Sequence, residues 1–118
     1  VREAQQEGYF VTVLYFWLDS PERALERVQS RVSKGGHNIP PETIRRRYFM
    51  GLQYFFEDYT KVCDRWILAD NSIPPFRVVA EGFRESSEMI VRDTVAFEKI
   101  KACLAEHRAA QQKEENGE

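Results

Sequence analysis

The chain has 118 residues, of which 42% are hydrophobic and 31% are charged. This length and composition describe one folded domain and exclude two independent domains, a disordered chain and a fibrous repeat. The longest apolar run, residues 9–18, is about half as long as a membrane-spanning helix requires. Because no apolar signal segment precedes it, we expect a cytoplasmic protein without a membrane span.

The net charge of −2 is unevenly distributed along the sequence. Residues 20–47 contain seven basic residues and only three acidic ones. A short basic segment in an otherwise acidic chain favours a local anion site, since nucleic-acid binding usually needs a broad basic face. Phosphate is therefore the expected anion. Cys63 and Cys103 lack metal-site spacing, so we expect two reduced core thiols and no metal site.

The first half of the chain predicts a helix end, a strand and two helices. Residues 1–7 are typical of a helix that ends at Gly8, and residues 9–18 are apolar enough for an interior parallel strand covered on both faces. Ser20 can cap a helix that starts at Pro21 and runs to about residue 33. After a glycine- and proline-rich loop, an apolar stripe predicts a helix over residues 41–63.

The second half predicts two strands and a helix. Residues 66–69 read as a short strand, and residues 76–82 as a more exposed strand at the sheet edge, because two prolines precede it. Ser86 or Ser87 can cap a last helix that ends near His107, with Met89 and Ile90 in the core. Residues 109–118 carry no large apolar residue and predict a flexible tail.

Alternating strands and helices predict an α/β fold with about three strands, three to four helices and a mostly parallel sheet. Residues 1–108 would form a single α/β domain. An interior parallel strand over residues 9–18 needs a partner on each edge, and the chain supplies few candidates. We therefore expect further polypeptide upstream.

Ligands of parallel α/β sheets bind beyond the carboxyl ends of the strands, here at Asp19-Ser20 and Asp70-Asn71-Ser72. The arginine-rich helix and the Gly35-Gly36 loop follow the first of these ends. Glycine hinges and guanidinium groups are what a lid over a transferred phosphate needs, so residues 31–47 predict such a lid. The sequence contains no GxxxxGK[ST] loop to hold a triphosphate, no nucleophile elbow and no HExxH.

Two segments carry a resemblance to a known family. They are ALERVQSRVSKGGHNIPPETIRRRYFMGL, residues 24–52, and CDRWILADNS, residues 63–72. Together they resemble the C-terminal half of zeta toxin-like P-loop kinases. The resemblance implies part of a P-loop kinase-like three-layer fold. For the complete kinase it implies ATP or GTP with Mg²⁺ and a small phosphate-accepting substrate; no cofactor is evident for this chain alone.

The resemblance also implies roles for individual residues. Arg27 and Arg31 would face phosphate from the base of the lid, and Arg46 and Arg47 from its far side. His37 occupies the place of a second lid arginine in zeta toxins. Asp70 and Asn71 would lie in the loop that borders the nucleotide base. Because the phosphate-binding loop is missing, we expect no turnover by the isolated chain, and its status as an enzyme stays open.

Other interpretations of the same residues remain open. The arginines could form a solvated helix face paired with Glu22 and Glu26, and Asp70-Asn71-Ser72 could be turn residues. Residues 21–33 and 41–63 could form a helix-turn-helix that binds nucleic acid, although the intervening loop is long for that motif. A noncatalytic interaction domain is a third interpretation. Association with further copies of the chain also stays open.

Overall fold

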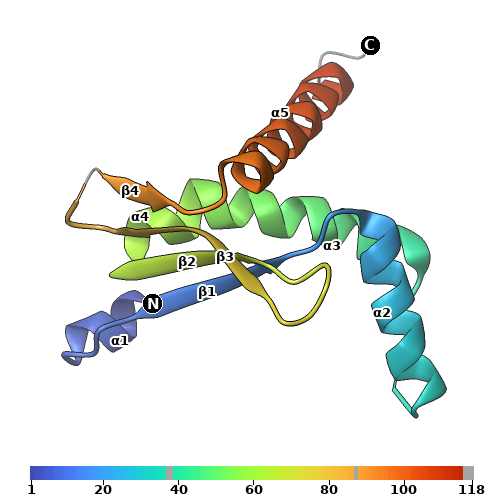
Figure 1. Ribbon diagram of the computed structural model, residues 1–118, viewed down its shortest axis with the longest axis horizontal. Coiled ribbons are helices and arrows are strands. Elements are labelled where there is room, and N and C mark those ends of the chain that lie inside the picture. The colour runs from blue at the N-terminus through green and yellow to red at the C-terminus, as the bar shows by residue number, and fades with distance from the viewer. Residues whose placement is uncertain (37–38, 87, 116–118) are drawn as a thin grey trace.

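The structure, a computed structural model, describes residues 1–36, 39–86 and 88–115. Its helices are α1 (Arg2–Gln6), α2 (Pro21–Ser33), α3 (Pro41–Tyr54), the π-helix η1 (Phe55–Tyr59), α4 (Thr60–Val62) and α5 (Thr94–Glu115). Its strands are β1 (Thr12–Trp17), β2 (Arg65–Asp70), β3 (Arg77–Phe83) and β4 (Met89–Val91). The predicted α/β class is confirmed, and within the described residues the sheet has four strands rather than about three (Figure 1).

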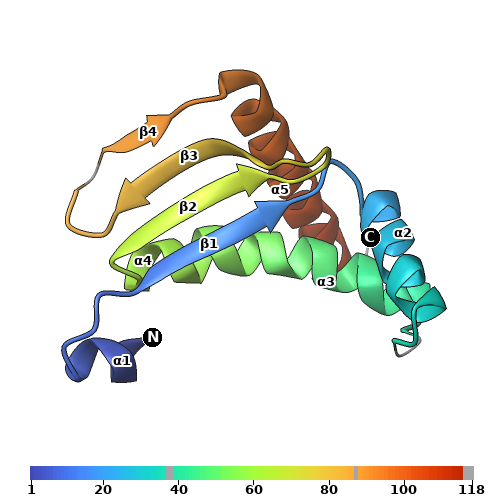
Figure 2. The ribbon, with the colours of Figure 1, turned by 60° about the horizontal axis from the view of Figure 1, so that its bottom comes forward.

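The sheet has the strand order β1-β2-β3-β4. β1 and β2 are parallel, as predicted, but β2 pairs antiparallel with β3, and β3 pairs antiparallel with β4 (Figure 2). The prediction of a mostly parallel sheet was therefore wrong. The reason is the short connection over residues 71–76, since a parallel return needs a crossover of a dozen residues or more.

Helices α3 and α5 pack on the same face of the sheet and build the core there. From β1, alternate side chains such as Val13, Tyr15 and Trp17 point into it. The fully or nearly fully buried side chains that complete it are Leu52, Phe55, Cys63, Trp66, Leu68, Val79, Phe97, Ile100 and Leu104. Cys63 is buried and Cys103 half-buried, and both are free, which confirms the expected core thiols.

The helix predicted over residues 41–63 is interrupted. α3 ends at Tyr54 and passes through the π-helix η1 into the short helix α4. Phe55 is fully buried, and the neighbouring Phe56 also packs against the core, with 5.3 Å between the two ring centroids. The apolar stripe therefore correctly indicated which side of this helix is buried, but it did not predict the π-helix η1 that follows α3.

The C-terminal third differs most from the prediction. Met89 and Ile90, predicted in a helix core, are exposed on strand β4, and the last helix begins only at Thr94. Its start is set by Asp93, whose Oδ1 accepts a hydrogen bond from the backbone N–H of Ala96 at 3.1 Å. The helix continues to Glu115, so most of the predicted tail is helical, as its good helix formers allow.

Two strands occupy other places than predicted. β3 lies between β2 and β4, so it is not the edge strand that its preceding prolines suggested. β1 is an edge strand rather than an interior one, because no other strand in the described ranges pairs with its second edge. None of the described helices is at once long and apolar enough to span a membrane.

Replacing Gly82 in β3 tests how tightly the core is packed. A Cβ atom at Gly82 would lie 2.6 Å from the indole ring of Trp66, which is buried and cannot move freely. We expect Gly82→Ala to lower the free energy of unfolding by about 1–3 kcal/mol, as overpacking does. Gly51→Ala in α3 is the control, since its Cβ meets Tyr15 at an ordinary 3.5 Å and alanine favours helix by roughly 1 kcal/mol. Urea unfolding measures both, and equal stability of the two variants would contradict this packing.

Candidate functional site

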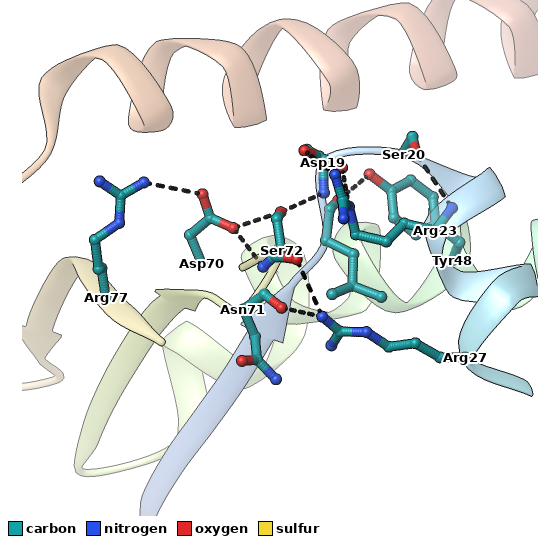
Figure 3. Close-up of polar contacts among 10 residues, drawn as sticks. Asp19, Ser20, Arg23, Arg27, Tyr48, Asp70, Asn71, Ser72 and Arg77 are labelled. Carbon is teal, nitrogen blue, oxygen red and sulfur yellow. Dashed lines mark hydrogen bonds and ion pairs between the residues drawn. The ribbon is translucent and has the colours of Figure 1, made fainter. Parts of the chain in front are cut away.

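The carboxyl ends of the parallel strands β1 and β2 meet at one edge of the sheet, here called the carboxyl edge. The backbone N–H of Asp19, after β1, donates to Oγ of Ser72, after β2, at 2.9 Å (Figure 3). The N–H of Asn71 donates to the carbonyl of Trp17, also at 2.9 Å, and adds one hydrogen bond to the pairing of β1 with β2. The two polar strand ends, which the sequence indicated as a place for ligand binding, therefore lie side by side.

Ser72 is the centre of this hydrogen-bond network. It is only 7% exposed, and its hydroxyl donates to Oδ1 of Asp70 at 2.6 Å while accepting from Asp19. The same carboxylate oxygen accepts from the backbone N–H of Ser72 at 2.9 Å. Nη2 of Arg77 lies 3.8 Å from the other oxygen of Asp70. Asp70 thus shapes the turn after β2, as its residue type allows.

A second set of contacts fixes the start of α2. Ser20 caps the helix by accepting from the backbone N–H of Arg23 at 3.2 Å. The Arg23 guanidinium donates from Nε and Nη2 to the two carboxylate oxygens of Asp19, at 2.7 and 3.2 Å. These hydrogen bonds hold the pKa of Asp19 below its ordinary value. The Arg23 guanidinium and the Asp19 carboxylate therefore form an ion pair at the start of α2.

Tyr48, on α3 at the core face of the sheet, contacts the segment between β1 and α2. Its hydroxyl donates to the carbonyl of Leu18 at 2.5 Å. Burial raises the pKa of Tyr48 well above that of a free phenol, so the hydroxyl stays protonated and keeps donating. The segment between β1 and α2 is thus held both by the turn after β2 and by α3.

Arg27 is the predicted site residue that the structure brings to the carboxyl edge. Its Nη2 donates to the backbone carbonyl of Asn71, and to that of Ser72 at 3.2 Å (Figure 3). The contact ties the middle of α2 to the turn after β2. Within the described residues its Nε and Nη1 have no hydrogen-bond partner, so several N–H groups of the guanidinium stay available.

The other predicted arginines do not join this network. Arg31, Arg46 and Arg47 are exposed and have neither an ion pair nor a side-chain hydrogen bond among the described residues. They lie on the hairpin formed by α2 and the first turns of α3, beyond the carboxyl edge, from where α3 runs back along the sheet (Figure 2). The inner face of this hairpin is apolar, around a cavity of about 230 Å³ lined by Leu25, Val28, Val32, Ile39 and Ile44, among others. His37, the remaining predicted residue of the lid, lies outside the described residues.

A cavity of about 390 Å³ opens at the carboxyl edge beside this network. Its charged and polar lining comes from Asp19, Asp70, Ser72, Arg77, Asp93 and Lys99. Sequence reasoning did not place Arg77, Asp93 or Lys99 at the site, and it missed the last two because they lie at the start of α5, which was placed several residues too early. The capping pattern of Asp93 before the apolar period of α5 could have located them.

This lining offers carboxylate acceptors and cationic donors together, which suits a polar ligand with both kinds of hydrogen-bonding group. In the described part of the chain, no three His, Cys, Asp or Glu side chains are close enough together to hold a metal ion. The carboxyl edge by itself therefore does not fit a resident Mg²⁺ ion held by three such side chains.

Removing the Ser72 hydroxyl tests the network. In Ser72→Ala, Asp70 loses a buried donor and the N–H of Asp19 loses its acceptor, so we expect the free energy of unfolding to fall by about 1–3 kcal/mol. Ser30→Ala, at an exposed position of α2, should change it by no more than about 0.5 kcal/mol. Urea unfolding compares the two, and equal effects would contradict the central place of Ser72.

Removing the Arg23 guanidinium tests the contact with Asp19. In Arg23→Gln we expect the pKa of Asp19 to rise, measured by NMR titration of its carboxyl carbon. Because the folded-state pKa is depressed, the contact stabilises the protein above the ordinary carboxyl pKa of about 3.9, and this stabilisation is lost as the pH falls through the depressed value. The stability difference between wild type and variant should therefore vanish at low pH. An unchanged pKa of Asp19 would show that another group holds it.

Comparison with known proteins identifies no relative. No protein-family model matches the chain, and neither a curated protein nor a solved structure matches it. What the site can do therefore follows from its own geometry and charges.

Proposed function

We propose that the chain is the lid-bearing, C-terminal part of a zeta toxin-like kinase that uses ATP or GTP to phosphorylate a small molecule. The observation that carries the proposal is a group of exposed arginines that have no ion pair among the described residues, on a helical hairpin at the carboxyl edge of a parallel strand pair. The resemblance of residues 24–52 and 63–72 to zeta toxin-like kinases indicates the type of kinase. On this proposal the isolated chain has no turnover.

Among the described residues, the arginines without an acidic partner all lie on α2 or α3, with the exception of Arg2. The arginines that have an acidic partner are Arg23, Arg65, Arg77, Arg84, Arg92 and Arg108. Arg31, Arg46 and Arg47 have none in the described ranges, although the chain as a whole is acidic. Guanidinium groups bind phosphate oxygens in a bidentate manner and stabilise the charge that spreads over a phosphoryl group during transfer.

The position of the hairpin fits a lid. Its first helix starts directly from the carboxyl edge, where ligands of parallel α/β sheets bind. At its far end Gly35 has a φ of 97°, a left-handed conformation that glycine adopts readily and other residues rarely do. Arg27 anchors the base of the hairpin on the turn after β2. The hairpin thus has a fixed base and a glycine turn at its tip.

The residues take different parts in this proposal. Arg31, Arg46 and Arg47 contact the phosphates, while Arg27 positions α2 and offers its remaining N–H groups to the same anion. Asn71 has a side-chain amide that points away from the Asp70–Ser72 turn, so it is available to the nucleotide base (Figure 3). The Asp70 carboxylate instead accepts two hydrogen bonds from Ser72 and so stabilises the turn after β2. Contact of His37 with phosphate stays a prediction.

On this proposal, the loop that binds the triphosphate must come from another polypeptide segment. A phosphate-binding loop of the GxxxxGK[ST] type does not occur in the sequence, and backbone N–H groups in such a loop hold the triphosphate. The lid can therefore add charge stabilisation but cannot by itself position ATP for transfer. Substrate turnover by the isolated chain would contradict the proposal.

The arginine roles can be tested by titrating the chain with ATP–Mg and GTP–Mg at low salt. We expect the side-chain Nε–H signals of Arg31, Arg46 and Arg47 to shift in NMR spectra, because phosphate oxygens accept from these groups. Alanine at one of these positions should weaken binding by about tenfold, the effect of roughly 1.4 kcal/mol from a charge-assisted contact. Arg92→Ala is the control, since Arg92 is exposed but paired with Glu81 at 3.2 Å.

A short DNA duplex is titrated on the same sample. Binding of the duplex that is tighter than that of ATP and falls steeply with salt would replace the kinase proposal by the helix-turn-helix interpretation. Binding that is unchanged by alanine at Arg31, Arg46 or Arg47 would remove the proposed role of the lid.

A further inference from the structure

Strand β4 is an edge strand, and half of its backbone groups point away from the sheet. The backbone N–H of Arg92, directly after β4, donates to the carbonyl of Val79 of β3 at 2.8 Å. In an antiparallel strand the N–H and C=O groups of successive residues point alternately to the two sides. Those of Ile90 therefore point to β3, and those of Met89 and Val91 point to the open edge, where no strand of the described residues lies.

The side chains of β4 are apolar on both faces of the sheet. Met89 is 51% exposed and Val91 38% exposed, on the face covered by α5. Both line a cavity of about 680 Å³ whose other apolar walls include Phe56, Phe97 and Leu104. Ile90, between them, points to the opposite face and is 50% exposed. An apolar edge strand of this kind favours association.

The residues that flank β4 have opposite charges and lie symmetrically about Ile90. Glu88 precedes the strand and Arg92 follows it, each two residues from Ile90. If β4 pairs antiparallel with β4 of a second copy about a two-fold axis at Ile90, Glu88 lies opposite Arg92 of the second copy. Opposite charges at directly opposed positions stabilise an antiparallel pair. An axis moved by one residue would instead place Glu88 or Arg92 opposite Ile90, so the charges select one register.

The same register suits the backbone. Met89 of one copy lies opposite Val91 of the other, and their outward N–H and C=O groups can donate to and accept from each other. The two Ile90 side chains meet at the axis, as a pair without mutual hydrogen bonds. The other edge strand, β1, contains no charged residue, so no charge pattern fixes a register for self-pairing there.

We propose that two copies of the chain associate through β4, antiparallel and centred on Ile90, so that their sheets become continuous across a two-fold axis. Glu88 of each copy forms an ion pair with Arg92 of the other, which already contacts Glu81 at 3.2 Å. β4 and α2 lie on opposite sides of the molecule in Figures 1 and 2, so this association leaves the arginine hairpin uncovered and does not depend on the kinase function.

Analytical ultracentrifugation of the full chain at low salt tests the proposal. We expect a dimer that forms as the concentration rises. Glu88→Arg should weaken it at least about tenfold, because two opposite-charge pairs become like-charge pairs. The side chain of Glu88 has no hydrogen bond or ion pair in the described part of the chain, so its loss leaves the fold intact. Glu26→Arg is the matched control, with the same charge change at an exposed position of α2, and should leave the dimer unchanged.

A mixture of two variants separates pairing from folding. Arg92→Glu should weaken the dimer as Glu88→Arg does. In an equimolar mixture of the two variants, one copy carries arginine at both flanking positions and the other carries glutamate at both. Every opposed pair is then of opposite charge, so we expect the mixed dimer to form where neither variant alone associates. A misfolded variant could not produce this rescue.

Amide hydrogen exchange locates the interface. We expect the amides of Met89 and Val91 to become protected as the concentration rises, while those of Leu14 and Phe16 on β1 do not. A chain that stays monomeric, a dimer that tolerates Glu88→Arg, or a mixture without rescue would overturn the proposal. Concentration-dependent protection of Leu14 and Phe16 instead would assign the contact to β1 and overturn it as well.

Discussion

The parallel pairing of β1 with β2 is the constraint on which the rest of the structure depends. It brings Asp19 and Ser72, far apart in sequence, within one hydrogen bond at the carboxyl edge. Ser72 is buried there, so its hydroxyl and the Asp70 carboxylate must satisfy each other. From this fixed edge α2 leaves the sheet, and Arg27 ties it back to the turn after β2. The direction of the arginine hairpin is thus set by the strand pair.

The two faces of the sheet have different status. One is covered by α3 and α5 and holds the core, whereas the other carries both the ion-paired Arg65–Glu81–Arg92 group and exposed apolar side chains, among them Leu14, Phe16 and Phe76. An ion-paired surface is stable in water, but an apolar surface next to an unpaired strand edge favours association.

Local chemistry made part of the fold predictable. α2 spans Pro21–Ser33 as expected, because Ser20, Pro21 and the glycines after it are signals that act within one helical turn. The strand β2 and the apolar stripe of α3 were predictable for a similar reason, since burial imposes a period on the sequence. The short strand β4 was not, because its exposed Met89 and Ile90 match a helical core pattern equally well.

By itself, the sequence determined the α/β class, a sheet that is parallel in part, the polar residues at the ends of the first two strands and the arginine content of the hairpin. Only the tertiary structure decided that β1 is an edge strand, that β3 is an interior one, and that Asp93 and Lys99 of α5 line the cavity at the carboxyl edge. It also decided that Arg27 holds the turn after β2 while Arg31, Arg46 and Arg47 stay exposed. The physical reason is range: caps, turns and periodicity act between near neighbours, whereas strand order and side-chain partners depend on packing between segments far apart in the chain.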